Sequence, residues 1–376
     1  MALLLKAMSN FIEIFSTLPD PRIERCKKHL LTDILYMTIV AVLCGANDWE
    51  EIEEFSEARE GWFSKFLPLP NGIPSHDTFS RVFALLDPAA LQEHFIRWVQ
   101  SIATVSAGHI VAIDGKRLCN AGEHGKQSIV HMVSAFSNDN NLVLGQLKVN
   151  DKSNEITAIP ELLKALYLKG SIITIDAMGC QTEIAKAIRE KEAEYVLAVK
   201  GNQGHLYDDI QEAFAEGLVV DEHITTCVNH GRVEKRTCKV IADTSWVCKV
   251  EQWEDLRSLI MIAAQRTNKK TGDTESQVRY YISSLLADAA KMNHAVKSHW
   301  GIENKLHWTL DVTFNEDKSR KRAGHAAENF STITKIAMNV LKNRDDKKGA
   351  KKLSIKTKRF KCNISTDYLT DVLKNL

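Results

Sequence analysis

The chain has 376 residues, a formal net charge of +1, and 44% hydrophobic and 26% charged residues. These values are typical of a soluble, well-packed protein with two domains or one large domain with additions. Its eight cysteines form no Cys-x-x-Cys pair, which argues against a zinc ribbon or a disulfide scaffold and favours a reducing cytoplasm. The longest apolar run, Ile34–Ala46, has 13 residues and is too short to span a bilayer, so we expect a cytoplasmic protein outside the membrane.

Residues 1–104 predict a helical N-terminal domain. Three segments show apolar residues at helical spacing: Ile34–Leu43, Trp49–Trp62 and Leu91–Ile102. The stretch PSHDTFSRVFALLDP has a helix start signal at Ser75 and a stop at Asp87-Pro88, so it predicts a further helix. That helix fits the recognition helix of a DNA-binding helix-turn-helix. An ordinary core helix has the same pattern, and the sequence leaves both open.

From His109 onward the sequence predicts an α/β domain that covers residues 105–345. Three β-type runs come first, HIVAIDGK, SIVHMVSAFS and NLVLGQLKV, and NDNN is a good hairpin turn between the last two. Helices and strands then alternate as far as EYVLAVKGN, which is the strand and helix order of an RNase H-like fold. Residues 201–285 contain short, polar strands and predict a β-rich insertion, and Ala289–Lys342 is helical again.

Residues 346–376 predict a basic C-terminal tail. Between Lys342 and Lys361 the chain carries ten Lys or Arg residues against two Asp residues, an excess of eight positive charges. Such blocks are usually solvated and also suit phosphate backbones, so a solvated end and nucleic-acid contact stay equally open. Because this segment has few large apolar residues, we expect a helix end that frays into a mobile segment tracking phosphates.

Two aspartates stand at the ends of predicted strands. Asp114 ends the run HIVAID, and Asp176 ends the run SIITID. Catalytic groups gather at the carboxyl ends of strands in such sheets. Together with Glu303 from a later helix, the two carboxylates would form an oxygen-rich site for Mg²⁺, suited to phosphodiester chemistry. Either aspartate alone would more often cap a helix or turn, but the matched pair and the downstream glutamate favour the metal site.

The stretch HWGIENKLHW, which begins at His299, places a glutamate between two histidines. On an α-helix His299, Glu303 and His307 would share one face, and Asp311 would extend it. The stretch lacks the His-Glu-x-x-His spacing of zinc hydrolases, and three such positions spread over roughly 12 Å, too far for one tetrahedral ion. We therefore interpret Glu303 as one arm of a larger acidic site, with the histidines as flanking phosphate or water contacts.

Nine stretches spread along nearly the whole chain form a specific set: SHDTFSRVFALLDP, AIDGK, KSNEITAIPELL, TIDAMGCQ, AVKGNQ, HGRVEKR, YYISSL, HWGIENKLHWTLDVTFNED and RAGHAAENFS. This set resembles the bacterial insertion-sequence transposases of the DDE type, in the group that includes the H-repeat-associated proteins. The resemblance implies an RNase H-like catalytic domain with Asp114, Asp176 and Glu303 as its metal-binding triad. It also implies Mg²⁺ or Mn²⁺ as cofactor and a helical N-terminal domain of the kind associated with these transposases.

The function implied by the resemblance is DNA transposition. The protein would bind terminal inverted repeats, cut DNA with a divalent metal, and join 3′ ends to target DNA, acting as a homodimer on double-stranded DNA in the bacterial nucleoid. Two rivals stay open, a metal-dependent nuclease without strand transfer and a catalytically silent DNA-binding relic. Nicked plasmid without joined products would favour the nuclease. The presence of all three acids argues against the relic.

A sister insertion-sequence group carries a Tyr-x2-Arg-x3-Glu-x6-Lys signature, of which only the glutamate is present here. Val296, His299 and Leu310 occupy the other three positions. The DNA contacts are therefore inferred from charge and position alone: Lys116, Arg117, Lys200, His299, Lys305, His307, Arg320 and Arg322. We expect Trp300 and Trp308 to be core residues rather than stacking platforms for bases.

Overall fold

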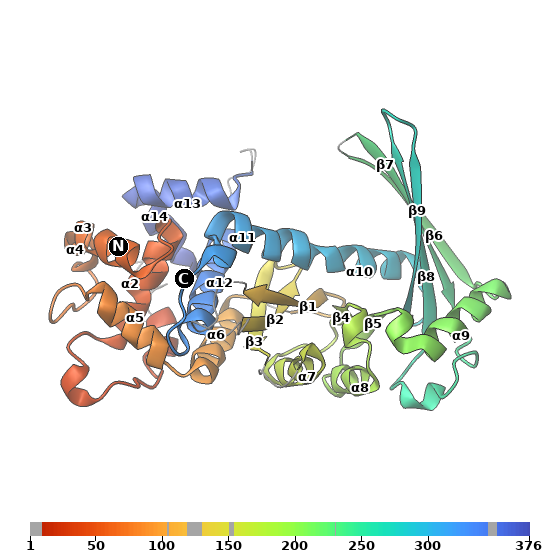
Figure 1. Ribbon diagram of the computed structural model, residues 1–376, viewed down its shortest axis with the longest axis horizontal. Coiled ribbons are helices and arrows are strands. Elements are labelled where there is room, and N and C mark those ends of the chain that lie inside the picture. Colours follow the sequence, from red (N-terminus) through yellow and green to blue (C-terminus); the bar gives the residue numbers. More distant parts are fainter. Residues whose placement is uncertain (1–9, 104, 119–129, 150–153, 230, 345–351) are drawn as a thin grey trace.

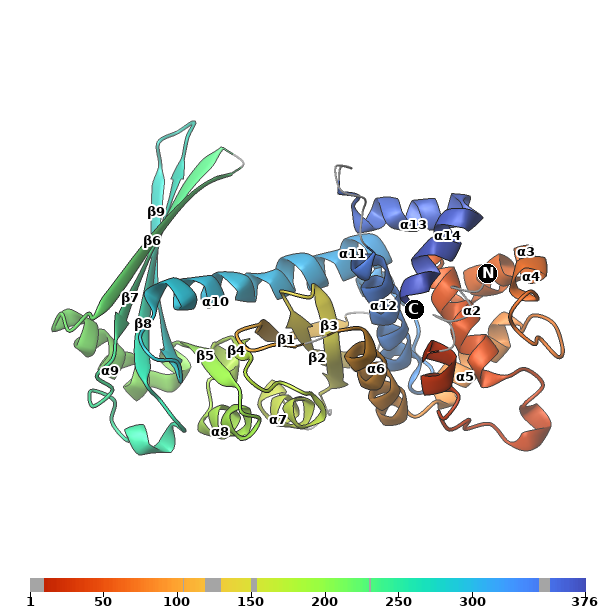
Figure 2. The ribbon, with the colours of Figure 1, turned by 180° about the vertical axis from the view of Figure 1, so that it is seen from behind.

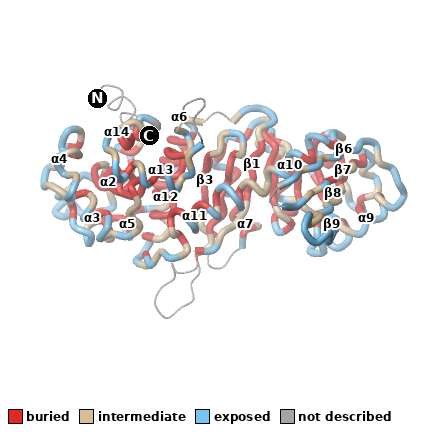
Figure 3. The backbone as a smooth tube through the Cα atoms, turned by 90° about the horizontal axis from the view of Figure 1, so that it is seen from above, coloured by how far each residue is buried: buried red, intermediate tan, exposed pale blue. Residues whose placement is uncertain are grey.

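The computed structural model describes residues 10–103, 105–118, 130–149, 154–229, 231–344 and 352–376. Figure 1 shows an elongated molecule with a group of helices at one end, a sheet in the middle and long projecting strands at the other end. One long helical segment runs along the sheet between the two ends. Buried residues run through α2, α12 and β3 in Figure 3, and one apolar cluster includes residues of the N-terminal helices, the sheet and the C-terminal helices.

The N-terminal helices correspond to the helical spacing of the sequence. They are α2 (Leu31–Cys44), α3 (Trp49–Ala58), α4 (Glu60–Phe63), α5 (His76–Leu85) and α6 (Pro88–Ile102). α2 is apolar on nearly every side and is buried almost throughout, as expected of a helix at the centre of a core. Asp48 and Asp87 cap α3 and α6 by accepting backbone hydrogen bonds, and Pro88 occupies the first turn of α6.

In the described part of the chain, nine strands form one sheet in the order β3-β2-β1-β4-β5-β9-β8-β7-β6. The strands are β1 (Ile110–Leu118), β2 (Val130–Ser137), β3 (Leu142–Lys148), β4 (Ile172–Ile175), β5 (Glu194–Val199), β6 (Asp221–Asn229), β7 (Arg232–Ile241), β8 (Ser258–Asn268) and β9 (Thr274–Ser283). β1, β2 and β3 are antiparallel neighbours, and β1, β4 and β5 are parallel neighbours. The predicted order of strands is therefore present, and the chain has a mixed α/β fold.

The predicted β-rich segment 201–285 continues this sheet. β9 pairs antiparallel with β5, and β8, β7 and β6 follow outward from it. The sequence suggested short strands, but β6–β9 have nine to eleven residues each and project well beyond the body (Figure 1, Figure 2). The projecting unit β6–β9 is termed the blade below. The sequence did not reveal the length of these strands, because polar residues occur on both of their faces. This weakens the alternation of polar and apolar residues by which a strand is recognised.

Helices cover both faces of the sheet. They are α7 (Glu155–Ala165), α8 (Thr182–Glu190), α9 (Gly204–Ala215), α10 (Ala289–Gly301), α11 (Trp308–Phe314) and α12 (Ala326–Asn343). α7 and α8 lie on one face and α10 crosses the other, above β1 and β4 (Figure 2). Short 3₁₀ turns occur at Glu24–Cys26, Ala177–Gly179, Gly201–Gln203, Val250–Gln252, Glu316–Lys318 and Leu373–Asn375. α10 thus connects the blade to the central strands.

A π-helical segment, Ile302–His307, separates α10 from α11. The expected regular α-helical ladder through His299, Glu303 and His307 is therefore wrong. A π turn contains an extra residue and shifts the phase of all later side chains. In this segment Glu303 is exposed, whereas Ile302 and Leu306 are buried in the core. Segments of this kind are frequent at functional sites.

The C-terminal residues form helices rather than the expected mobile tail. α13 (Ile355–Ile364) packs against α2 and α12, and α14 (Thr366–Val372) packs against α13. Arg359 is 7% exposed and donates hydrogen bonds to the carbonyl oxygens of Val42 and Thr313. The prediction was wrong because Lys and Arg can bury their aliphatic stems when their charged heads find carbonyl partners. The part of the tail at 345–351 lies outside the described residues.

We expect Arg359→Met to lower the free energy of unfolding by about 2 kcal/mol, because it leaves buried carbonyl groups without their donor. Lys356→Ala on the exposed side of the same helix is the matched control and should change stability by less than about 0.5 kcal/mol. Thermal unfolding followed by circular dichroism measures both. Equal stability of the two variants would show that α13 contributes little to the fold.

Among the described residues, no single helix has both the length and the apolar character needed to cross a membrane. One bent pair, Glu24–Cys44 with Trp49–Ala58, reaches that threshold by length and composition only. The described cysteines are all free thiols.

Candidate functional site

Asp114 and Asp176 lie side by side on neighbouring parallel strands. The parallel register pairs Ile113 of β1 with Ile175 of β4, so each aspartate is the next residue along. β4 ends there, and Asp176 caps the following 3₁₀ turn by accepting a hydrogen bond from Met178 N. β1 continues through Asp114 to Leu118 and pairs with β2, so Asp114 stands inside its strand rather than at its end. Only the pairing of β1 with β4 stops before Asp114, at Ile113.

Glu303 faces the same pocket as the two aspartates. The pocket has a volume of about 460 Å³, and its wall is formed by β1, β4, β5, β9 and α10 with the π segment. Acidic, basic and aromatic side chains share its lining, among them Asp114, Asp176, Lys200, Tyr207, Arg279, His299, Trp300 and Glu303. The structure therefore brings Glu303 together with two aspartates that lie more than a hundred residues before it in the chain.

Negative charge accumulates around Asp114. Burial and the nearby carboxylate of Asp176, with smaller contributions from Glu155 and Glu303, raise the pKa of Asp114 to about 7. A hydrogen bond from Gly115 N, at 2.9 Å from Asp114 Oδ1, opposes the shift. Carboxylate oxygens that repel one another in a partly buried pocket are the donors that Mg²⁺ and Mn²⁺ prefer, so the residues fit a divalent cation chemically. Within the described ranges, however, no three acid, histidine or cysteine side chains are close enough to enclose a metal as they stand.

Glu155 is a fourth acid that sequence reasoning missed. It is 9% exposed at the start of α7, and its Oε1 lies 2.7 Å from His131 Nε2 on β2. A methyl group added at Gly115 would lie only 2.1 Å from Glu155 Oε1, which shows how closely this carboxylate approaches the strand beside Asp114. Burial and Asp176 raise the pKa of Glu155. The signal in the sequence was the glutamate of KSNEITAIPELL at the start of a helix next to the aspartate strands.

The two histidines lie on either side of the acids and are both largely buried. His299 Nδ1 lies 3.0 Å from Thr174 Oγ1, and burial lowers the pKa of His299. His307 Nδ1 lies 3.6 Å from Asp114 Oδ2, and its Nε2 is buried without a hydrogen-bond partner. Burial, with Lys335 and Lys116 nearby, lowers the pKa of His307 to about 4. Both rings are therefore expected to be neutral at pH 7, as hydrogen-bonding groups rather than cations.

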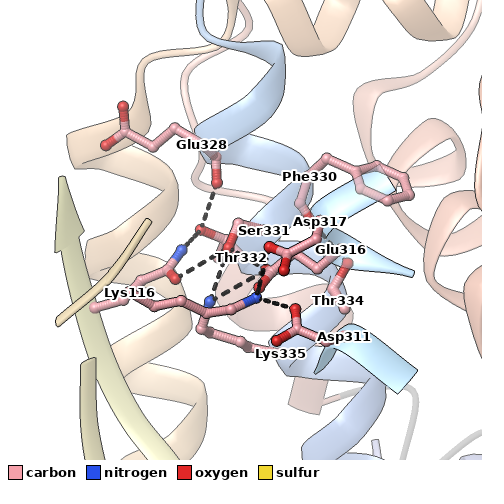
Figure 4. Close-up of polar contacts among 11 residues, drawn as sticks. Lys116, Asp311, Glu316, Asp317, Glu328, Phe330, Ser331, Thr332, Thr334 and Lys335 are labelled. Carbon is pink, nitrogen blue, oxygen red and sulfur yellow. Dashed lines mark hydrogen bonds and ion pairs between the residues drawn. The ribbon is translucent and has the colours of Figure 1, made fainter. Parts of the chain in front are cut away.

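Lys116 belongs to a buried ion-pair network behind the site (Figure 4). Its Nζ pairs with Asp311, with Glu316 at 2.7 Å and with Asp317 at 3.4 Å. Burial alone would lower the pKa of Lys116, but Glu316 and Asp311 outweigh it and raise the pKa. Its expected role as a DNA contact does not fit an ammonium group enclosed by carboxylates. Asp311, expected beside the histidines, instead ties α11 to β1.

The same network contains Glu316 and Lys335, which are 8% and 2% exposed. Lys335 Nζ donates to Ser331 Oγ at 2.7 Å and lies 3.7 Å from Glu316 Oε1. Burial would raise the pKa of Glu316, but Lys335 and Lys116 outweigh it and lower the pKa to about 2. The network joins β1, α11, the 3₁₀ turn at Glu316–Lys318, and α12, and so fixes the back of the site (Figure 4).

The other predicted DNA contacts lie in different surroundings. Lys200 is exposed and lines the acidic pocket. Lys305 and Arg117 are also exposed, and they follow Glu303 and Asp114 closely in the sequence. Arg320 and Arg322 line a separate basic pocket of about 750 Å³, together with Trp49, Ser80, Lys318 and Lys321. That pocket lies between the N-terminal helices and the segment after α11, so the structure divides the predicted basic residues between two places.

The tryptophans of HWGIENKLHW are not core residues, contrary to expectation. Trp308 is 59% exposed, and Trp300 is half-buried at the end of α10. The guanidinium groups of Arg266 and Arg279 lie over the Trp300 ring, 5.7 Å and 5.1 Å from its centroid. Trp300 lies in α10 before the π segment and faces the arginines of the blade, and Trp308 begins α11 on its exposed side.

Two protein families match the sequence. The family described as Transposase DDE domain matches residues 103–340, and the family described as DDE_Tnp_1-associated matches residues 12–99. "Putative transposase YncI" of Escherichia coli O157:H7 is 44% identical over 98% of this chain and 95% of its own length. "H repeat-associated putative transposase YhhI" and "Putative protein YbfL" of Escherichia coli strain K12 are each 40% identical over 97% of this chain and 98% of theirs. The family match over most of the chain and these near full-length relatives show that the protein belongs to the DDE transposases, in the group that includes the H repeat-associated transposases.

Proposed function

We propose that the protein is an active DNA transposase that binds the terminal inverted repeats of its insertion sequence, cleaves DNA and transfers the 3′ ends to a target. The observation that carries the proposal is the meeting of Asp114, Asp176 and Glu303 in one pocket. Three antiparallel strands followed by two parallel ones, with α7 and α8 between them, support an RNase H-like catalytic domain. In this assignment the three acids are the metal ligands.

The residues around the acids have distinct tasks in this proposal. Asp114, Asp176 and Glu303 would hold the cation, which supplies the Lewis acidity that activates a water or 3′-hydroxyl and stabilises the leaving oxygen. Glu155 positions the strand beside Asp114 and adds negative charge to the site. His307, neutral at pH 7, keeps a polar nitrogen beside Asp114 without neutralising it.

DNA would be bound on both sides of this pocket. Lys200, Lys305 and Arg117 would contact phosphates near the acids, and Arg320 and Arg322 would contact them at the basic pocket beside the N-terminal helices. Residues 1–104 would recognise the ends, with α5 as a candidate reading helix. Bringing two ends together requires at least a dimer on DNA.

The test is incubation of the full chain with duplex DNA carrying its own element's ends and Mg²⁺ or Mn²⁺. Nicks at the 3′ ends, followed by products joined to a second DNA, support transposition. Nicking without joined products supports the nuclease, and no nicking with either metal contradicts both. End DNA should be cut in preference to a random duplex of equal length.

Gly115→Ala is expected to lower the rate of nicking at least about tenfold, because the new methyl group forces Glu155 and His131 away and disturbs Asp114. Gly201→Ala is the matched control, since a methyl group there meets no atom within 4 Å. Rates are measured on the same end DNA at saturating Mg²⁺. Equal nicking rates for the two variants would show that the position of Glu155 does not affect the reaction.

A further inference from the structure

Three arginines stand on neighbouring strands of the blade, on one face of the sheet. Arg236 on β7 pairs with Ala264 of β8, and Arg279 on β9 pairs with Ile262 of β8. Directly paired residues share a face, as do residues two apart in a strand, so Arg236, Arg266 and Arg279 point the same way. α10 packs on this face of β6, β7 and β8, so the arginines stand where the helix ends and the blade leaves the body.

Trp300 organises two of these arginines. Arg266 and Arg279 both lie over its ring, at 5.7 Å and 5.1 Å from the centroid. Arg279 Nη2 also donates to Gln277 Oε1 at 3.1 Å. A guanidinium group held flat against an aromatic ring keeps N–H groups at its edge for a further acceptor, and its charge is undiminished. The Trp300 ring thus holds both guanidinium groups in place, and among the described residues Arg279 forms no ion pair.

Arg236 has more hydrogen-bonding capacity than its surroundings use. It is 9% exposed, and its Nε is buried without a hydrogen-bond partner. Glu234 is its ion-pair partner at 3.8 Å, and the same carboxylate lies 3.6 Å from Arg266. Glu275, opposite Arg266 in the ladder, is exposed. Among the described residues, three guanidinium groups therefore share this face with one carboxylate at ion-pair distance, that of Glu234, and leave an excess of positive charge.

The cluster is continuous with the acidic pocket. Arg236, Arg266, Arg279 and Trp300 line one crevice, and Arg279 and Trp300 also line the pocket of Asp114, Asp176 and Glu303. The crevice holds only about 10 Å³, so a phosphate would lie across its mouth rather than inside it. A chain of phosphates could therefore pass from the arginines to the acids along one surface.

We infer that this arginine cluster binds the sugar-phosphate backbone of a DNA strand and leads it into the acidic pocket. The inference rests on the proposed function, because it takes DNA as the substrate of that pocket. The ligand is the phosphate backbone, not the bases, since the three guanidinium groups surround no base-sized cavity. The blade is then a DNA-binding arm and not only an extension of the sheet.

The experiment measures DNA binding without cleavage. Fluorescence anisotropy with EDTA, between 50 and 200 mM salt, gives the slope of log affinity against log salt for the full chain on its own end DNA and on random duplex. Arg279→Gln and Arg266→Gln should each make the slope shallower by roughly 0.9 on both DNAs, the value for one lost phosphate contact. Arg279→Lys should restore most of the slope, because it restores the charge.

Lys235→Gln is the matched control. Lys235 is exposed, precedes Arg236 in β7 and so points to the opposite face, and its replacement should leave the slope unchanged. Circular dichroism verifies folding, and if Arg279→Gln fails to fold, Arg266→Gln and Arg279→Lys carry the test. Unchanged slopes in the folded arginine variants, or an equal loss in Lys235→Gln, overturn the inference. If the wild-type chain nicks its ends but the variants keep the slope, the inference is wrong and the proposed function stands. If the wild-type chain neither binds nor nicks DNA, the inference and the proposed function are both wrong.

Discussion

Asp114→Asn, Asp176→Asn and Glu303→Gln are each expected to lower end cleavage by roughly a thousandfold or more, with end binding nearly unchanged. Each substitution keeps the size of the side chain but removes a charge from the pocket that the three acids share. Loss of one member of a unit that holds a cation removes most of its catalysis. Cleavage of end DNA is measured in Mg²⁺ and Mn²⁺, and binding is measured with EDTA.

The control for this result is Glu212→Gln, which changes an exposed acid on α9 by the same chemistry. It should cleave at the wild-type rate. Isothermal titration with Mn²⁺ adds a readout that does not depend on cleavage, and each triad variant should bind the ion more weakly than Glu212→Gln does. Cleavage by any triad variant within tenfold of wild type would reject that residue as a metal ligand.

The second large effect is on stability. Glu316→Gln should lower the free energy of unfolding by about 3–5 kcal/mol and the melting temperature by roughly 5–10 °C, because it leaves Lys116 and Lys335 buried without their shared carboxylate. Glu222→Gln removes one side of an exposed pair with Lys239 and should cost less than about 1 kcal/mol. Differential scanning calorimetry compares the two. Similar melting temperatures would mean that the buried network is not a stabilising element.

The same carboxylate gives stability a defined dependence on pH. The pKa of Glu316 is lowered to about 2 in the folded protein, below its ordinary value of 4.5. Its contribution is therefore fully present above pH 4.5 and is lost as the pH falls from 4.5 toward 2. In Glu316→Gln this part of the acid-induced loss of stability should disappear. An identical acid profile in the wild type and the variant would contradict the assignment.

The acids could be predicted from the sequence because their signals are local. Asp114 and Asp176 each follow a short apolar run of β type, although β1 continues through Asp114 and only β4 ends just before its aspartate. Glu155 gave a weaker signal, since a glutamate at the start of a helix is also a favourable residue for the helix itself. Only the pairing of β1 with β2 and the packing of α7 bring it to Gly115.

Other features depend on partners distant in the chain. Arg359 is buried because Val42, more than three hundred residues earlier, accepts its hydrogen bonds, and no local pattern contains that information. Phe360, an apolar residue next to Arg359 in the same helix, is 62% exposed, so hydropathy alone does not show which side of α13 is buried. The π segment is equally hidden, because the sequence HWGIENKLHW satisfies an α-helix and contains no local signal for the wider turn.

The position of the π segment gives Glu303 a mechanical setting unlike that of the two aspartates. Asp114 lies in β1 and Asp176 directly follows β4, whereas Glu303 lies in the middle of the helical segment formed by α10, the π segment and α11 (Figure 1). At one end of this helical segment α10 packs against the blade, and at the other end Asp311 of α11 forms an ion pair with Lys116 of β1. The position of Glu303 therefore depends on how α10 packs against the blade and how α11 is held to β1, whereas the position of Asp114 depends on strand pairing within the sheet.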